Sequence, residues 1–95
     1  MEKLLIEWGK VDRSEALETA VKEKAEKLLR VYPETTNLIV GFQITNPVSS
    51  AGPAQHKVSM ELRLPNHKDI RSAKEGENLY SLISETERAL LAQKR

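Results

Sequence analysis

The feature that most limits the fold is a change, along the chain, in the spacing between apolar residues. Residues 3–8 alternate apolar and polar positions, with Leu4, Ile6 and Trp8 on one side, so they predict a strand. From residue 15 to about 30, apolar residues recur every three or four positions, which predicts an amphipathic helix with Asp12 or Ser14 as its N-cap. Alternating runs at residues 38–45, 56–64 and 69–75 then predict three strands, and a second helix follows Asn78.

These patterns also predict the core. The first helix gathers its apolar positions on one face: Leu17, Ala20, Val21, Ala25, Leu28, Val31 and Tyr32. The second helix gathers Leu79, Leu82, Ile83, Ala89 and Leu90, with Thr86 interrupting the stripe. Two strands point Leu38, Val40, Phe42 and Ile44, and Val58, Met60, Leu62 and Leu64, toward the helices. The second of these strands turns Lys57, Ser59, Glu61 and Arg63 to water.

The order of elements predicts the architecture. Three strands joined by turns form an antiparallel meander, and the first strand reaches the sheet through a helical crossover. We therefore expect an α+β two-layer sandwich, β-α-β-β-β-α, in which a four-stranded sheet carries both helices on one face. With 95 residues, the chain has room for one domain, residues 1–95. Residues 46–54, rich in proline, glycine and serine, are expected to form a mobile loop.

Composition excludes several classes of function. The chain has no cysteine, so disulfides, a thiol nucleophile and thiolate metal sites are excluded. An acid at Glu7 interrupts the first apolar run too early for a signal peptide, and no stretch approaches the roughly 20 apolar residues of a membrane span. We therefore expect a soluble, cytoplasmic protein.

Candidate catalytic residues are few. His56 lies at a predicted strand start and His67 in a predicted turn, and neither has a serine or carboxylate pattern typical of a triad. His67 with Asp69, and His56 across the hairpin, lack the spacing of known metal motifs. Acids flank Gly76 on both sides and would repel a phosphate. The sequence predicts no enzyme, no metal and no cofactor.

The distribution of basic residues points to another kind of function. Lys plus Arg number 15 against 14 Asp plus Glu, so a nucleic-acid partner would require local segregation of charge. Lys24 projects into the apolar face of the first helix and Lys27 lies on its flank, where two neighbouring helices would form a groove open to RNA phosphates. The alternative is that these lysines only extend along the edge of the core. Other basic residues could enlarge the surface: Arg71, Lys74, Arg88, Lys94 and Arg95.

Two segments carry a resemblance to a known family. The first segment is residues 11–18, Val-Asp-Arg-Ser-Glu-Ala-Leu-Glu, which is followed by Val21, Lys24, Lys27 and Leu28. The second segment is residues 73–83, Ala-Lys-Glu-Gly-Glu-Asn-Leu-Tyr-Ser-Leu-Ile. In this order and spacing the chain resembles the ribosome hibernation-promoting factor and ribosome-associated inhibitor family, also called sigma modulation proteins. The resemblance implies a fold like that of a double-stranded-RNA-binding domain, in a short form without the C-terminal region of longer members.

The resemblance also implies a function. Members dock in the decoding region of the small ribosomal subunit and block messenger and transfer RNA, through basic side chains on and between the helices. Carried over to this chain, the contacts fall on Lys24, Lys27 and Arg30, with Lys74, Arg88, Lys94 and Arg95 around them. The expected partner is small-subunit rRNA, without DNA or membrane, and a weak homodimer is left open. The second helix is neutral in charge, which favours the alternative of a protein-binding module that uses the sheet edge or face.

Overall fold

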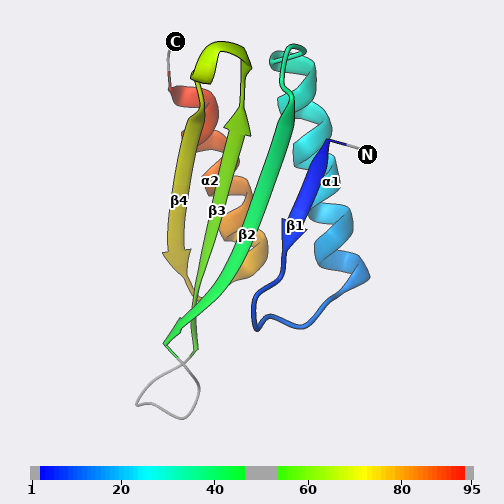
Figure 1. Ribbon diagram of the computed structural model, residues 1–95. Coiled ribbons are helices and arrows are strands. Elements are labelled where there is room, and N and C mark those ends of the chain that lie inside the picture. Colours follow the sequence, from blue (N-terminus) through cyan, green and yellow to red (C-terminus); the bar gives the residue numbers. More distant parts are fainter. Residues whose placement is uncertain (1–2, 47–53, 94–95) are drawn as a thin grey trace.

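The computed structural model describes residues 3–46 and 54–93, and it confirms the predicted order of elements (Figure 1). The elements are β1 (Leu4–Glu7), α1 (Glu15–Val31), β2 (Asn37–Asn46), β3 (Gln55–Arg63), the short 3-10 helix η1 (Pro65–His67), β4 (Ile70–Gly76) and α2 (Leu79–Ala92). The strands form one sheet in the order β1-β2-β3-β4. β1 is parallel to β2, and the other pairs are antiparallel. Most of the predicted mobile loop, residues 47–53, lies outside the described residues.

Local side-chain chemistry sets where both helices begin. The Ser14 hydroxyl accepts a hydrogen bond from the backbone N–H of Leu17 at 3.3 Å, so Ser14 rather than Asp12 is the N-cap of α1. Asn78 caps α2 by accepting from the N–H groups of Tyr80 and Ser81, at 2.9 and 3.2 Å. Each cap satisfies donors that have no partner within the helix. The predicted caps Ser14 and Asn78 are therefore confirmed.

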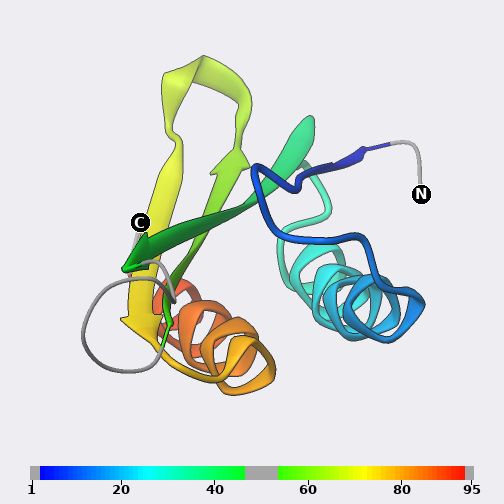
Figure 2. The same ribbon diagram turned by 90° about the horizontal axis from the view of Figure 1, so that it is seen from below.

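Both helices cover the same face of the sheet, as predicted (Figure 2). The core between the layers contains the predicted inward side chains of β2 and β3 other than Ile44, and the buried positions of α1, among them the fully buried Leu28. Lys57, Ser59, Glu61 and Arg63 lie on the opposite, open face, because they alternate with buried residues along β3. Within the described part of the chain, neither helix is long and apolar enough to cross a membrane.

Two predicted core residues are in fact exposed. Val31 is 51% exposed because it occupies the last turn of α1, at about 80° from the centre of the buried stripe. Ile44 is 38% exposed because it lies near the end of β2, and this end of the strand extends beyond both described helices (Figure 1). Ala20 and Ala89 are half-buried rather than buried. The spacing of the apolar residues therefore predicted the elements correctly, but apolar residues near the ends of α1 and β2 are not buried.

Thr86 does not interrupt the buried face of α2, contrary to the prediction. Its side chain is fully buried, and its hydroxyl donates a hydrogen bond of 3.4 Å to the backbone carbonyl of Val58 in β3. The Ser72 hydroxyl of β4 in turn donates to the Thr86 carbonyl at 2.7 Å. Gln93, just after α2, donates to the carbonyl of Arg71. These polar contacts fix the position of α2 over β3 and β4, since a buried hydroxyl needs a partner.

Candidate nucleic-acid interface

Three basic residues of α1 lie at different angles to its buried stripe. At 100° per residue, Lys24 is about 60°, Lys27 about 120° and Arg30 about 180° from the centre of the stripe formed by Leu17, Val21, Ala25, Leu28 and Tyr32. Lys24 is accordingly half-buried, whereas Lys27 and Arg30 are exposed. The structure therefore groups Lys24 and Lys27 on one flank and places Arg30 on the side facing away from the sheet.

The flank that carries Lys24 and Lys27 faces α2. Both helices run in the same direction behind the sheet, α1 behind β1 and α2 behind β3 and β4 (Figures 1 and 2). The angular position of a residue around a right-handed helix increases by 100° for each step along the chain. With α1 running in this direction, positions at smaller angles than the buried stripe, such as Lys24 and Lys27, lie on the flank toward α2. Ala20, on the same flank, packs against the core. Lys24 and Lys27 therefore lie on the flank of α1 that faces α2, where the sequence predicts a groove.

The flank of α2 that faces α1 contains a buried acid that was not predicted from the sequence. Glu87 lies about 70° from the centre of the buried stripe of α2, on the side toward α1. It is only 4% exposed, and its Oε2 atom has no hydrogen-bond partner among the described residues. No ion pair joins it to Lys24 or Lys27 in the described part of the chain. The facing flanks of the two helices therefore combine two lysines with one buried carboxylate.

The other predicted site residues do not lie on these facing flanks of α1 and α2. Arg88 is exposed on the side of α2 that points away from the sheet, about 170° from the centre of its buried stripe. Lys74 is exposed on β4, the edge strand on the far side of α2 from α1. Lys94 and Arg95 lie outside the described residues. Lys24 and Lys27 thus form the centre of the candidate surface, and Arg30 and Arg88 lie on its outer side.

An ion pair occupies the opposite flank of α1. Lys22 and Glu18, one helical turn apart, lie 3.0 Å from each other between Nζ and Oε2. The hydrogen bond and the positive charge of Lys22 lower the pKa of the Glu18 carboxyl from its ordinary value. Because Lys22 already has an acidic partner and lies away from α2, it contributes little to the facing flanks of the two helices.

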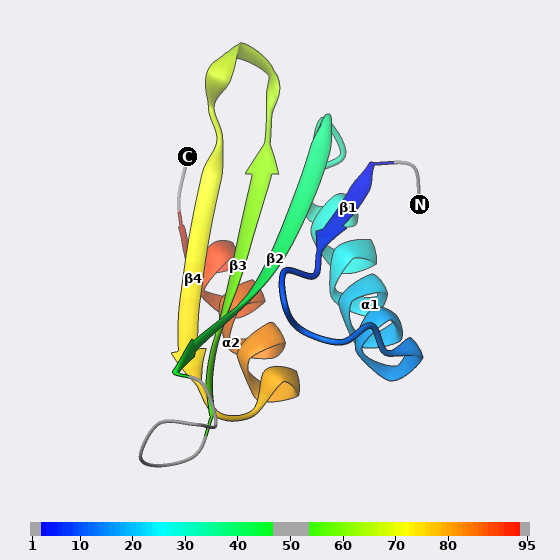
Figure 3. The same cartoon turned by 60° about the horizontal axis from the view of Figure 1, so that its bottom comes forward.

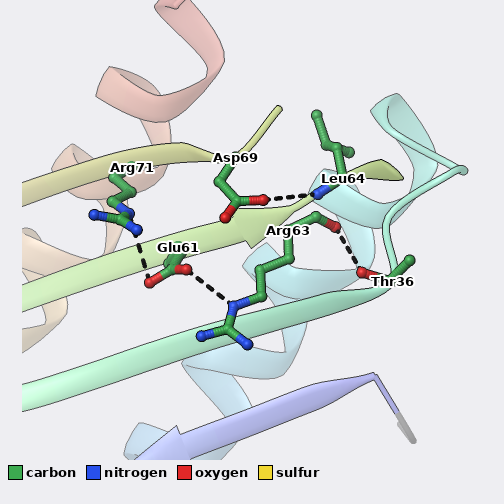
Figure 4. A network of polar contacts seen from close by, with 6 residues as sticks. All are labelled: Thr36, Glu61, Arg63, Leu64, Asp69 and Arg71. Carbon is green, nitrogen blue, oxygen red and sulfur yellow. Dashed lines mark hydrogen bonds and ion pairs between the residues drawn. The ribbon is translucent and has the colours of Figure 1, made fainter. Parts of the chain in front are cut away.

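A second polar cluster lies on the open face of the sheet (Figure 4). Glu61 binds Arg63 at 2.9 Å and Arg71 at 3.6 Å, so one carboxylate holds two guanidinium groups on neighbouring strands. The hydrogen bond and charge of Glu61 raise the pKa of Arg63. At the hairpin end, Asp69 accepts from the N–H of Leu64 at 3.3 Å, and the Thr36 hydroxyl donates to the Arg63 carbonyl at 3.1 Å. These contacts order the open face without any contribution from the helices.

Metal chemistry finds no support in the described residues. Over residues 3–46 and 54–93, no three His, Cys, Asp or Glu residues come together as a metal site would require. His56 belongs to β3 and His67 to η1.

A four-stranded mixed sheet with two helices packed on one face defines the class of the chain as an α+β two-layer sandwich of the order β-α-β-β-β-α. Within that class, the chain belongs to the family described as sigma 54 modulation protein / S30EA ribosomal protein, which matches residues 4–94. The family resemblance seen in the sequence is therefore confirmed. Members of this family are non-enzymatic ribosome modulators, in agreement with the prediction that the chain is not an enzyme.

The fold is also seen in a solved structure. The chain is similar to a structure described as a ribosomal subunit interface protein from Coxiella burnetii, with 22% identity and a TM-score of 0.74. The match covers 92% of this chain and 87% of that chain. This likeness shows that the two chains share a fold. A search of curated proteins gave no match.

Proposed function

We propose that this protein binds small-subunit rRNA on cytoplasmic ribosomes and inhibits translation, with Lys24 and Lys27 as the central phosphate contacts. The observation that carries the proposal is the position of both lysines on the flank of α1 that faces α2. Neither lysine has an acidic partner among the described residues, so both ammonium groups are available to phosphate. Membership of a family of ribosome modulators supports the same partner.

The surrounding basic residues have a secondary role in this proposal. Arg30 and Arg88 extend the surface on its outer side, Lys74 lies at the sheet edge, and Lys94 and Arg95 continue the chain after α2. Phosphate contacts release condensed counterions, so affinity falls steeply as salt rises, and each contact adds to the slope. Loss of one of these outer residues should therefore lower affinity less than loss of Lys24 or Lys27.

Co-sedimentation with small ribosomal subunits in low salt tests the proposal. Reversal of both charges, Lys24→Glu with Lys27→Glu, should abolish co-sedimentation, whereas the thermal melt followed by circular dichroism should change little. A matched control, Lys10→Glu with Lys22→Glu, makes the same change in net charge away from the facing flanks of α1 and α2 and should retain binding. If the wild type stays at the top of the gradient, or the Lys24/Lys27 variant still sediments with the subunit, the proposal is wrong.

A milder variant covers the case in which charge reversal disturbs the half-buried Lys24. Lys24→Gln with Lys27→Gln removes two charges and keeps most of the side-chain volume. The slope of log affinity against log salt should then fall by about 1.5 to 2, close to one unit for each lost phosphate contact. An unchanged slope would show that neither lysine contacts phosphate.

One observation favours a second candidate, a protein-binding module. The two helices together carry more acids than bases: Glu15, Glu18, Glu23, Glu26, Glu85 and Glu87 against Lys22, Lys24, Lys27, Arg30 and Arg88. A helix layer with this balance attracts phosphates only through local segregation of charge. Failure of the wild type to sediment with ribosomal subunits would favour this candidate.

A further inference from the structure

Among the described residues, one acidic side chain is buried, and it is Glu87 of α2. Its Oε2 atom is buried and has no hydrogen-bond partner in the described part of the chain. Most buried polar atoms in proteins have a partner, so an acid without one requires an explanation. Residues that depart from the general rules of folding in this way are often found at functional sites. The surroundings of Glu87 therefore indicate what it could do.

Glu87 and Lys24 lie at nearly the same height on the facing flanks of the helices. α1 and α2 begin at the same end of the sheet and run in the same direction (Figure 1). Lys24 is nine residues after Glu15 and Glu87 is eight residues after Leu79, so they lie about 13.5 Å and about 12 Å along their helices. Cα atoms of the two helices approach to within 8 Å of each other. Glu87 is therefore the acid that faces Lys24, with Lys27 one turn further along α1.

Glu87 does not neutralise either lysine. No ion pair shorter than 4.0 Å joins it to Lys24 or Lys27 in the described part of the chain, whereas Glu18 and Lys22 on the other flank of α1 pair at 3.0 Å. A carboxylate that is near an ammonium group but does not bind it leaves that group available to a phosphate. Its own negative charge then repels the same phosphate. Glu87 and the two lysines therefore have opposite effects on an approaching RNA.

We propose that Glu87 limits the affinity of the protein for RNA, because it repels the phosphates that Lys24 and Lys27 attract. The proposal rests on the RNA-binding function proposed above and concerns the strength of that binding. For two unit charges about 10 Å apart at an effective dielectric constant of about 20 to 40, Coulomb's law gives about a four- to sixteenfold change in affinity. Exposed acids of the helices, such as Glu23 and Glu85, are screened by water and have a smaller effect.

The consequence of this repulsion is selectivity. Non-specific binding of RNA depends almost entirely on phosphate contacts, so a repulsive charge beside those contacts lowers it. A specific site can add contacts that involve no phosphate, and these are not weakened by Glu87. The buried carboxylate therefore disfavours RNAs that offer phosphates alone.

A direct hydrogen bond from RNA to Glu87 is disfavoured by burial. A ribose hydroxyl or a base amino group would have to reach an atom that lies inside the protein. If such a contact existed, removal of the carboxylate would lower affinity, whereas removal of a repulsive charge raises it. The sign of the change separates the two roles.

Glu87→Gln tests the proposal, because it removes the charge and keeps the side-chain volume. Its affinity for small ribosomal subunits, measured by co-sedimentation over a concentration series in low salt, should be at least about threefold higher than that of the wild type. Glu85→Gln makes the same change in net charge at an exposed position on the side of α2 away from α1, and should change affinity by less than about twofold. A fall in affinity for Glu87→Gln, or equal changes in the two variants, would overturn the proposal.

Two further measurements separate an effect of charge from altered packing. The slope of log affinity against log salt should change by less than about 0.5 in Glu87→Gln, since the number of phosphate contacts stays the same. When Lys24→Gln and Lys27→Gln are also present, Glu87→Gln should raise affinity by less than about twofold, because no phosphate is then held beside it. The same gain with and without the two lysines would contradict repulsion of their phosphates.

A probe without a ribosome distinguishes failure of this proposal from failure of the proposed function. Phosphocellulose presents phosphate groups alone, and Glu87→Gln should elute from it at higher salt than both the wild type and Glu85→Gln. If the wild type does not sediment with small subunits, the RNA-binding function is wrong, and elution from phosphocellulose decides whether Glu87 weakens phosphate binding. If the wild type sediments but Glu87→Gln behaves like it in both experiments, only the proposal for Glu87 is overturned.

Discussion

The two faces of the sheet are built from different residues although they share the same four strands. On the face covered by the helices, Leu38, Val40, Val58 and Met60 are almost completely buried. On the open face, which is the side of the sheet turned away from both helices (Figure 3), the row of Glu7, Gly41, Ser59 and Ala73 consists of small or polar residues. The comparison shows that burial of apolar side chains stabilises one face, whereas the side chains of the other face remain partly or fully exposed to solvent.

The largest difference in the free energy of unfolding should come from truncating a leucine in the covered core and a leucine on the open face. Leu28→Ala removes a fully buried leucine from α1 and should cost about 2–5 kcal/mol through lost burial and a cavity. Leu5→Ala removes a half-exposed leucine from the open face and should cost less than about 1 kcal/mol. Denaturant melts of the two variants measure both values. Similar losses would show that the open face is covered in solution.

Alanine substitutions at two glycines should differ in their effect on stability, because one glycine has a positive φ and the other does not. Gly9 has φ of 59°, and a Cβ atom there would lie 2.6 Å from the backbone oxygen of Phe42. Gly9→Ala should therefore cost about 1–3 kcal/mol. Gly41→Ala should change stability by less than about 1 kcal/mol in either direction, because only side chains must move. Thermal melts of both variants check the difference, and a large loss for Gly41→Ala would contradict it.

Substitution of the buried Glu87 in α2 should change the stability of the fold by a smaller amount. Glu87→Gln removes the charge of a buried carboxylate whose Oε2 atom has no partner in the described residues, and should stabilise the fold by about 1 kcal/mol. Glu85→Gln, on the exposed side of the same helix, is the matched control and should have almost no effect. Urea melts at neutral pH measure both. Destabilisation by Glu87→Gln would show that its charge has a partner in solution.

The smallest effect concerns the ion pair on the outer flank of α1. Because Lys22 lowers the pKa of Glu18 in the folded chain, the ion pair stabilises the fold at pH values above the pKa of Glu18 in the unfolded chain. This stabilisation is lost as the pH falls through the pKa of Glu18 in the folded chain. Lys22→Gln should raise the pKa of Glu18 toward 4.5, as followed by NMR titration of the carboxyl carbon. Lys27→Gln, on the other flank, should leave it unchanged. No rise in the Lys22 variant would mean that the pair does not persist in solution.

Sequence patterns predicted the parts of the fold that depend on local chemistry. The alternation along β3, the stripe through Leu28 and the caps at Ser14 and Asn78 all follow from residues close in sequence. Thr86 and Glu87 could not be predicted to be buried, since hydropathy assigns polar side chains to the surface. The partner of Thr86 is a carbonyl of β3, 28 residues away, and only the tertiary structure brings it close.

The candidate site could be predicted only in part for the same reason. The angular positions of Lys24 and Lys27 on a helix follow from the sequence, but the side on which α2 lies does not. The position of Glu87 on the flank that faces α1, and the separation of Arg88 from the lysines, depend on how α2 rotates about its own axis. That rotation is set by the hydrogen bonds of Thr86 and Ser72 with their partners.

The parallel pairing of β1 with β2 has a consequence for the order of folding during synthesis. β1 is made before the other described strands, but its one partner among them, β2, begins at Asn37, after the whole of α1. β2, β3 and β4 pair with their sequence neighbours, so they close shorter loops. We therefore expect β1 to be the last of the four described strands to acquire amide protection from hydrogen exchange, and its four-residue pairing with β2 to be the first to open.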